Sequence, residues 1–397
     1  MRLVHGMMIP FALVLAVILI AGLAPSNQAA AYAPYSIKLG SPILDVAVNP
    51  ATNTIYVSHV NSISVINGSS YSLAATIPLD ATNDAVGLAV DAPANRLYAA
   101  AQDSNQVYVI DTLANRVVEK IPARGWPVGV AVNPETNLVY VANSASGRSE
   151  SYDFPVEDDL VSVINGTTYR VVADIDVGSR FLSEEGITRD TQGIGVSAPT
   201  TISVNPGTNM VYVGGGMSGD IVAVDAYANK VAARIPIEGS HLGSDINLDT
   251  NTVYFSNNGR GAIDVIDGSS NTLYYSIERK ENGRPFSFPE DVAVNPKTNK
   301  LYVADLDSVS IIDPDSRKVI KTIDIGGYKD VAVNPETNLA FVTVRDSSSL
   351  VIIDGNTNEM ILDPGSYAYE IAAGIGVVSI AVAIFFIKKH KRKSDRA

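Results

Sequence analysis

Short apolar runs recur along the chain, separated by polar turns. The segment 46–57 reads Val-Ala-Val-Asn-Pro-Ala-Thr-Asn-Thr-Ile-Tyr-Val, and variants of it return at 88–98, 130–141, 202–213, 246–255, 292–303 and 331–342. In each copy, a near-continuous apolar run is typical of a strand buried on both faces. The Asn-Pro-x-Thr-Asn element is typical of a turn, and the aromatic and β-branched run after it predicts a second strand. Two further apolar runs follow, so each copy predicts four short strands.

The copies return at a regular interval. Their anchor residues are spaced by 42, 42, 72, 42, 48 and 39 residues and are Asn49, Asp91, Asn133, Asn205, Asn247, Asn295 and Asn334. Four-stranded units of about 40 residues are typical of propeller blades. The sequence therefore predicts an all-β, seven-bladed β-propeller of four-stranded blades over residues 35–363.

The repeat resembles the YVTN family of β-propeller repeats, found in archaeal surface-layer proteins and in exported propellers of the YncE type. The residues that carry the resemblance are Tyr-Val-Ala-Asn at 140–143, Tyr-Val-Ser-His at 56–59 and Tyr-Val-Ala-Asp at 302–305. The resemblance covers all seven copies. It implies an exported or surface location, but no single biochemical activity.

Both ends of the chain predict a membrane association. Residues 1–31 have the order of a secretory signal peptide, with Arg2, an apolar core and small residues near Ala29, although an uncleaved signal anchor is an alternative. Residues 367–387 predict one transmembrane helix, because a long apolar run follows two flanking tyrosines. The basic segment 388–397 is then a cytoplasmic tail, and the propeller lies on the cell surface.

The ring can close in two ways. The seventh copy ends early, and the missing half of its last strand is found at the front of the chain, so residues 35–39 are expected to supply the outer strand of the last blade. In the alternative, residues 359–362 form that strand. The two closures tether opposite faces of the ring to the bilayer.

Two long insertions, 144–159 and 178–199, fall on one face of the predicted ring. Loops of this length are often functional. Their carboxylates make calcium a candidate ligand, with solvated acidic loops as the alternative, and the metal candidates are Asp153, Asp158 and Asp159. Aromatic and basic residues of the connections between blades are expected on the same face, either as an interaction surface or as packing between blades: Arg124, Trp126, His241, Arg284, Phe286, Phe288 and Tyr328.

Two glycosylation sequons start at Asn67 and Asn165, both in the predicted turn between the third and fourth strands of a blade. Asn and Asp are first of all turn formers at this position. Glycosylation is the functional interpretation, and it requires export.

Composition narrows the function. The chain has no cysteine, which excludes thiolate metal sites, disulfides and cysteine nucleophiles. It has four histidines. The net charge is −13, and about −19 without Arg2 and the basic tail, so nucleic-acid binding is not expected. No catalytic constellation stands out. The sequence thus predicts a membrane-anchored scaffold for envelope or surface-layer proteins, without a cofactor. The alternatives are a tethered lactonase-like hydrolase or lyase with carboxylates at the channel mouth, and a ligand-carrying or sensing propeller.

Overall fold

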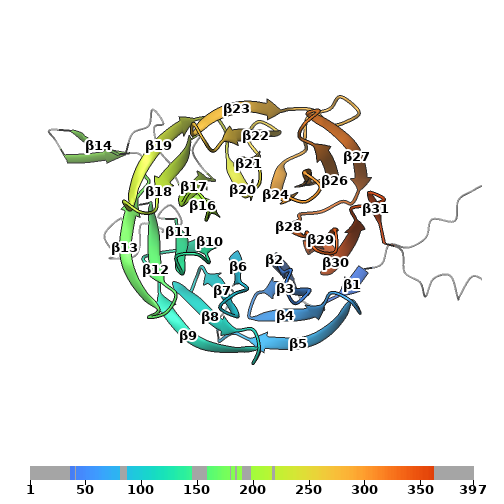
Figure 1. Cartoon of the computed structure of the whole chain (residues 1–397), viewed down its shortest axis with the longest axis horizontal. Coiled ribbons are helices and arrows are strands. Elements are labelled where there is room, and N and C mark those ends of the chain that lie inside the picture. The colour runs from blue at the N-terminus through green and yellow to red at the C-terminus, as the bar shows by residue number, and fades with distance from the viewer. Residues whose placement is uncertain are drawn as a thin grey trace, which may run out of the picture. The chain divides into compact units, whose positions relative to one another are not determined.

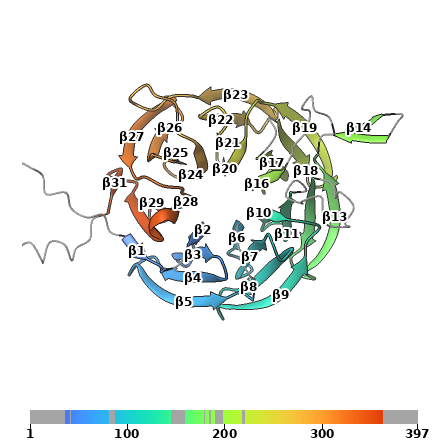
Figure 2. The ribbon, with the colours of Figure 1, turned by 180° about the vertical axis from the view of Figure 1, so that it is seen from behind.

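Seven four-stranded antiparallel blades stand in chain order around a central channel (Figures 1 and 2). The computed structural model describes residues 36–40, 42–80, 87–144, 159–178, 180–183, 186–189, 198–216 and 220–361. The predicted all-β, seven-bladed architecture is confirmed. The segments predicted as signal peptide, transmembrane helix and basic tail lie outside the described residues. Among the described residues, no helix has the length and apolar character needed to cross a membrane.

The strands of a blade are termed A to D from the channel outwards. Blade 1 consists of β2 (Ile43–Asn49), β3 (Thr54–His59), β4 (Ser62–Asn67) and β5 (Ser72–Pro78). Blade 2 consists of β6 (Gly87–Asp91), β7 (Arg96–Ala101), β8 (Gln106–Asp111) and β9 (Arg116–Pro122). Blade 3 consists of β10 (Pro127–Asn133), β11 (Leu138–Asn143), β12 (Leu160–Asn165) and β13 (Arg170–Asp176). Blade 4 consists of β16 (Pro199–Asn205), β17 (Met210–Gly215), β18 (Asp220–Asp225) and β19 (Lys230–Pro236). Blade 5 consists of β20 (His241–Asn247), β21 (Thr252–Asn257), β22 (Ala262–Asp267) and β23 (Thr272–Ile277). Blade 6 consists of β24 (Pro289–Asn295), β25 (Lys300–Asp305), β26 (Ser308–Asp313) and β27 (Lys318–Asp324). Blade 7 is built on β28 (Val331–Asn334), β29 (Leu339–Val344) and β30 (Ser349–Asp354).

The hydrophobic core lies between blades rather than within them. Each of the seven junctions between neighbouring blades has its own cluster of buried residues, and the last cluster joins blade 7 to blade 1. The B strands are buried almost throughout, whereas a D strand such as β5 buries only Ile77 among seven residues. A single blade therefore cannot bury its own apolar faces, and the ring forms as one unit.

The repeated Asn-Pro-x-Thr-Asn element has a structural role at the A–B turns. The first Asn closes the turn, because the Asn49 side-chain oxygen accepts the N–H groups of Ala51 and Thr52. The last Asn, such as Asn53 at φ +49°, adopts the left-handed conformation that Asn tolerates better than most residues. The first Asn of one blade also donates its amide to the last Asn of the next at five junctions: Asn133 to Asn209, Asn205 to Asn251, Asn247 to Asn299, Asn295 to Asn338 and Asn334 to Asn53.

Two half-strands form the outer strand of blade 7, so the expected closure by residues 35–39 holds for one half of it and the alternative closure by residues 359–362 for the other half. The strand β1 (Ser36–Lys38) pairs with residues 349–351 of β30, and β31 (Glu359–Met360) pairs with Ile353 and Asp354. Figure 1 shows β31 and β1 one after the other along the outer edge of blade 7. A shared outer strand satisfies the whole edge of β30, since Ile361 N–H also donates to the Ile352 carbonyl. The described chain thus begins and ends at the rim of the ring, not on either of its faces.

We expect substitution of Ile37 by Asp to lower the free energy of unfolding by about 2 kcal/mol, because the carboxylate would enter the apolar cluster between blades 7 and 1. Lys38→Asp is the matched control, since Lys38 is exposed on the same strand. Urea unfolding of the two variants tests this. An equal decrease in the free energy of unfolding for both variants would contradict a role of β1 in closing the ring.

The second insertion forms a hairpin. It consists of β14 (Arg180–Ser183) and β15 (Gly186–Arg189), which pair with each other and with no blade. In Figure 2, β14 projects outwards beyond β13 and β19.

Candidate binding face and channel mouth

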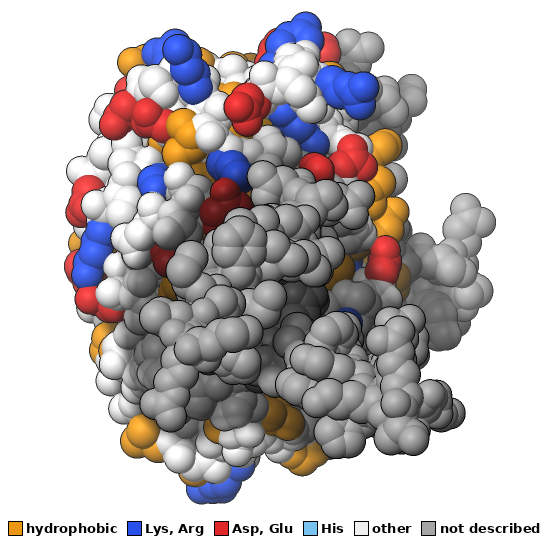
Figure 3. Space-filling model, turned by 90° about the vertical axis from the view of Figure 1, so that its right-hand side faces the viewer, with side chains coloured by type: hydrophobic (Ala, Val, Ile, Leu, Met, Phe, Trp, Pro, Cys, Tyr) orange, Lys and Arg blue, Asp and Glu red, His pale blue; other side chains and the backbone are white. Residues whose placement is uncertain are grey.

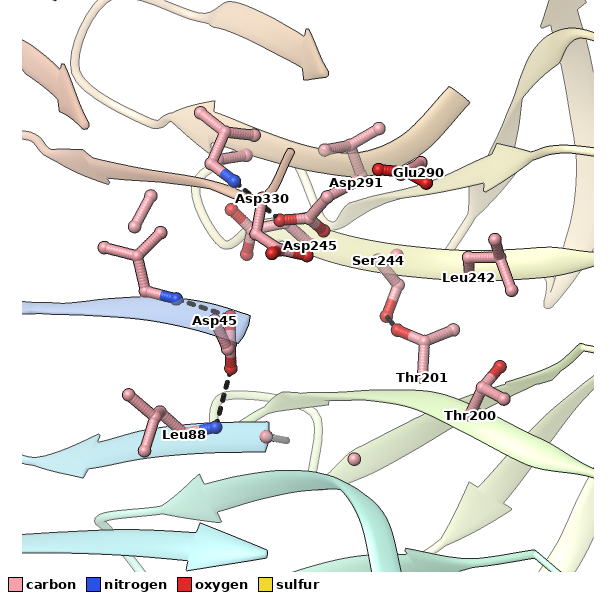
Figure 4. A pocket seen from close by; sticks show the side chains of 18 of the residues that line it. Asp45, Leu88, Thr200, Thr201, Leu242, Ser244, Asp245, Glu290, Asp291 and Asp330 are labelled. Carbon is pink, nitrogen blue, oxygen red and sulfur yellow. Dashed lines mark hydrogen bonds between the residues drawn. The ribbon is translucent and has the colours of Figure 1, made fainter. Parts of the chain in front are cut away.

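The B–C loops and D–A connections lie on one face of the ring, called here the loop face, and the A–B and C–D turns lie on the other, the turn face. On the loop face, the channel opens into a cavity of about 530 Å³. All seven innermost strands or the residues just before them line it, and Figure 4 shows the carboxylates of Asp45, Asp245, Asp291 and Asp330 in one part of its wall.

Three of these carboxylates occupy one position of the repeat. Asp45, Asp291 and Asp330 each precede a Val-Ala-Val run, in blades 1, 6 and 7. Because these blades are neighbours in the closed ring, the three side chains meet, although Asp45 is far from the other two in sequence. The equivalent residues of the other blades carry no charge. Sequence reasoning missed this group, although the repeated Asp-Val-Ala-Val was a visible signal.

The carboxylates tie neighbouring blades together. Three of them accept the N–H of a residue in the following blade: Asp45 from Leu88 (2.7 Å), Asp245 from Val294 (2.8 Å) and Asp291 from Val331 (3.0 Å). Asp45 and Asp245 also each accept the N–H of the residue that follows them. A carboxylate with two backbone donors fixes the register between blades at the channel.

Arg345 links blade 7 to blade 1, where the ring closes. Its guanidinium donates to both oxygens of Asp330, at 3.2 and 3.1 Å, and to the Leu44 carbonyl of blade 1 at 3.2 Å. It is also the only basic side chain among the described residues that line the channel mouth. The ion pair lies within blade 7 and positions the guanidinium, whose hydrogen bond to Leu44 then joins blade 7 to blade 1.

The crowding of carboxylates raises their pKa values. Burial, with the charge of Asp330 adding to it, raises the pKa of Asp45 to about 8, and the same two causes hold the pKa of Asp291 well above its usual range. Burial raises the pKa of Asp245 to about 6. Burial also raises the pKa of Asp330, an effect that Arg345 partly offsets. All four aspartates are half-buried rather than fully enclosed. The raised pKa values favour the protonated carboxyl at higher pH than is usual for Asp.

The carboxylates at the channel mouth have a structural role as links between blades. Among the described residues, no group of three or more His, Cys, Asp or Glu side chains could hold a metal ion. The carboxylates do converge at the channel mouth, as the hydrolase alternative requires, but their oxygens are engaged by backbone donors and by Arg345.

Two of the rim candidates are buried in the ring, so the alternative of packing applies to them rather than that of an interaction surface. His241 is the first residue of β20 and fully buried, and Phe286 is 3% exposed within the cluster between blades 5 and 6. His241 Nε2 lies 3.1 Å from Asp264 Oδ2. Asp264 also accepts from Asn257 at 2.7 Å and from Ser276 at 2.6 Å. This network crosses all four strands of blade 5 and leaves no histidine on the loop face within the described residues.

The other expected side chains lie at the loop face. Phe288 is 58% exposed and Tyr328 is 49% exposed, while Trp126 is half-buried. Arg124 and Arg284 are exposed, and Arg124 pairs with Asp174 at 3.1 Å. They come from three different connections between blades, so the fold distributes them around the face rather than joining them into one patch.

Lys329 adds no exposed charge to the loop face. This side chain is fully buried, its Nζ donates to the carbonyls of Asp305 and Gly327, and burial lowers its pKa to about 8. The ammonium group of Lys329 is therefore engaged within the ring.

The metal and glycosylation candidates remain predictions. Asp153 and Asp158 lie outside the described residues, and Asp159 is buried and accepts the N–H of Ala198. Asn67 and Asn165 end the C strands β4 and β12, and each uses its side-chain oxygen to close the C–D turn. Their sequon hydroxyls, on Ser69 and Thr167, accept from the neighbouring A–B turn.

Comparison with known proteins supports the fold. No protein-family model matches the chain, and no curated protein matches it in sequence. The resemblance to YVTN repeats therefore stays a prediction. Among solved structures, the chain is similar to Kuenenia stuttgartiensis hydrazine synthase, with 14% identity, a TM-score of 0.65, and coverage of 80% of this chain and 97% of that chain.

Two further structures are similar. One is the RRP9 WD40 repeats, with 13% identity, a TM-score of 0.62, and coverage of 83% and 99%. The other is U3-55K, with 13% identity, a TM-score of 0.61, and coverage of 79% and 93%. At this identity the likeness shows the fold alone, and an enzyme and WD40 repeats share that fold. The chain is a seven-bladed β-propeller, an architecture compatible with a protein-interaction scaffold.

Proposed function

We propose that this protein is a membrane-anchored propeller at the cell surface that acts as a scaffold for envelope or surface-layer proteins. The observation that carries the proposal is the set of exposed aromatic and arginine side chains on the loop face, above all Phe288, Tyr328 and Arg284. Such residues are enriched in protein interfaces. The similarity to WD40 repeats supports the same kind of role.

The position of the chain ends supports a tether at the rim. The described chain enters at Ser36 and leaves at Ile361, both beside the outer edge of blade 7. In the proposed topology, the C-terminal anchor starts a few residues after Ile361. The side of the molecule in Figure 3 carries interspersed acidic and basic side chains with scattered apolar ones over its described part.

The hydrolase alternative has weaker support. It relies on carboxylates at the channel mouth, and those in the described part are engaged in ties between blades. The ligand-carrying alternative relies on the cavity of about 530 Å³, which has a size typical of ligand sites.

A photo-crosslinking amino acid placed at Tyr328 tests the scaffold. We expect it to capture discrete envelope proteins in intact cells of the source organism. Tyr227 is the matched control, because it is an aromatic residue that is 80% exposed at the C–D turn of blade 4, on the turn face. Equal capture from both positions, or none from Tyr328, would overturn a role of the loop face.

Fractionation of the same cells tests the anchor. We expect the protein to remain with membranes at alkaline pH and its propeller to be accessible to protease added outside the cells. Release into the soluble fraction would contradict the transmembrane assignment.

A further inference from the structure

The connection between blades 5 and 6, residues 278–288, is firmly fixed. Lys280, with 8% exposed surface, forms a buried ion pair with Asp305 at 2.7 Å and donates to Ser308 at 3.0 Å. Phe286 is buried against both blades, and its N–H donates to the Gly261 carbonyl. Gly261 has φ +62°, and a Cβ there would lie 2.6 Å from the Phe286 carbonyl oxygen. The backbone of this connection is thus held in place on both sides.

A groove of about 440 Å³ opens beside this connection on the loop face. Two arginines and one exposed aromatic ring line it, together with glycine backbone: Arg260, Arg284, Phe288, Gly259 and Gly261. Asp307 is the only acidic side chain among its described lining residues. A preorganised wall of this kind lowers the entropy cost of binding.

The fold does not require the aromatic ring of Phe288. Phe288 precedes Pro289 at the start of strand A and has φ +52°. Ala198 has φ +55° at the equivalent position of blade 4, before Pro199. Since alanine suffices there, the exposed ring of Phe288 has no backbone role that explains it. Exposed aromatic side chains without a structural role are typical of protein-binding sites.

The charges of the groove favour an anionic group. Among the described residues, none bonds to the guanidinium of Arg284, whereas Arg260 pairs with Glu278 at 3.1 Å and lies 3.8 Å from the buried Asp264. Two arginines against one carboxylate contrast with the acidic chain as a whole. Arginine binds carboxylates with two parallel hydrogen bonds, so a free guanidinium beside an exposed ring suits an acidic and aromatic pair of side chains.

We propose that the groove between blades 5 and 6 binds a short segment of a partner protein that carries a carboxylate side chain near an aromatic or large aliphatic one. The carboxylate pairs with Arg284, and the apolar side chain packs on Phe288. This rests on the proposed scaffold function and assigns it a specific contact.

Fluorescence anisotropy with synthetic peptides tests the site on the full-length protein in detergent. The probes are labelled hexapeptides that combine Asp or Glu with Phe, Tyr, Trp or Leu at every spacing, and a second set has Asn or Gln instead of the acids. We expect saturable binding of at least one acidic peptide with Kd below about 1 mM, at least tenfold weaker binding of its amide counterpart, and weakening by salt.

Two variants and a matched control locate the site. Arg284→Gln and Phe288→Ala should each weaken binding at least tenfold, and the melting temperature of Phe288→Ala should stay unchanged, as Ala198 shows alanine to be accepted. Trp126→Ala is the control, because Trp126 occupies the equivalent position of blade 3 with φ +28° and lies outside this groove. Absence of saturation for every acidic peptide, equal binding of the amide set, or insensitivity to both variants would overturn the proposal.

The peptide-binding test of the groove and the crosslinking test of the scaffold can fail independently. Crosslinking from Tyr328 without peptide binding would retain the scaffold and overturn the groove. Peptide binding that depends on Arg284, without crosslinking from Tyr328, would retain the groove and overturn the wider role of the loop face.

Discussion

Substitution of Asp264 by Ala is expected to lower the free energy of unfolding by about 3–5 kcal/mol, the largest effect of any single change considered for this protein. The Asp264 side chain is fully buried and accepts from His241, Asn257 and Ser276. Its removal leaves these three side chains without their acceptor, and each unsatisfied buried group costs about 1–3 kcal/mol. Arg260, 3.8 Å away, loses an ion partner as well.

Urea unfolding followed by circular dichroism measures this loss. Asp267→Ala is the matched control, since Asp267 lies at the end of the same strand but serves only the solvent-facing C–D turn. The Asp267→Ala substitution should lower the free energy of unfolding by about 1 kcal/mol or less. A loss for Asp264→Ala no greater than that of the control would show that the network contributes little to blade 5.

The stability of the propeller is expected to fall as the pH rises from 5 to 8, and Asp45→Asn is expected to reduce that fall by about 2–4 kcal/mol. In the unfolded chain the Asp45 carboxyl loses its proton near pH 4. In the folded chain, burial and the charge of Asp330 raise its pKa to about 8. Between these values the folded state binds more protons, so raising the pH favours unfolding. The stabilisation is complete below about pH 4 and lost as the pH rises through 8.

Denaturant unfolding at pH 5, 6, 7 and 8 checks this prediction. Carboxylates with lowered pKa values, such as Asp111 and Asp267, are ionised throughout this window in both states and do not contribute to the slope. Asp225→Asn, at a solvent-facing C–D turn, is the control and should keep the full slope. A pH-independent stability of the unmodified protein, or an equal slope for Asp45→Asn, would contradict a raised pKa of the Asp45 carboxyl.

The repeat made the blades predictable because its signals are local. The apolar run of strand A, the Asn-Pro-x-Thr-Asn turn and the Tyr-Val strand each lie within a dozen residues, and the structure confirms their order in all seven blades. The left-handed Asn53 and its six counterparts follow from the intrinsic preference of Asn.

The candidate site was less predictable because its residues meet only in the closed ring. Nothing near His241 in the sequence shows that Asp264 lies beside it, so an exposed position was expected where the structure has a buried one. Phe286 and Phe288 are two residues apart, yet one fills the junction between blades and the other points outwards. That difference depends on how the connection between blades 5 and 6 is held.

The sequence by itself determined the number of blades, the order of their strands and the chemistry of their turns, since these depend on periodicity and on backbone preferences of neighbouring residues. Only the tertiary structure decided how the ring closes, where the carboxylates meet and which aromatic side chains remain exposed. Closure by β1 and β31 requires two segments that are far apart in the chain to share one edge of β30. The meeting of Asp45 with Asp291 and Asp330 requires blade 1 to return to blade 7. Contacts of this kind depend on distances between residues that are far apart in the chain, which no local pattern contains.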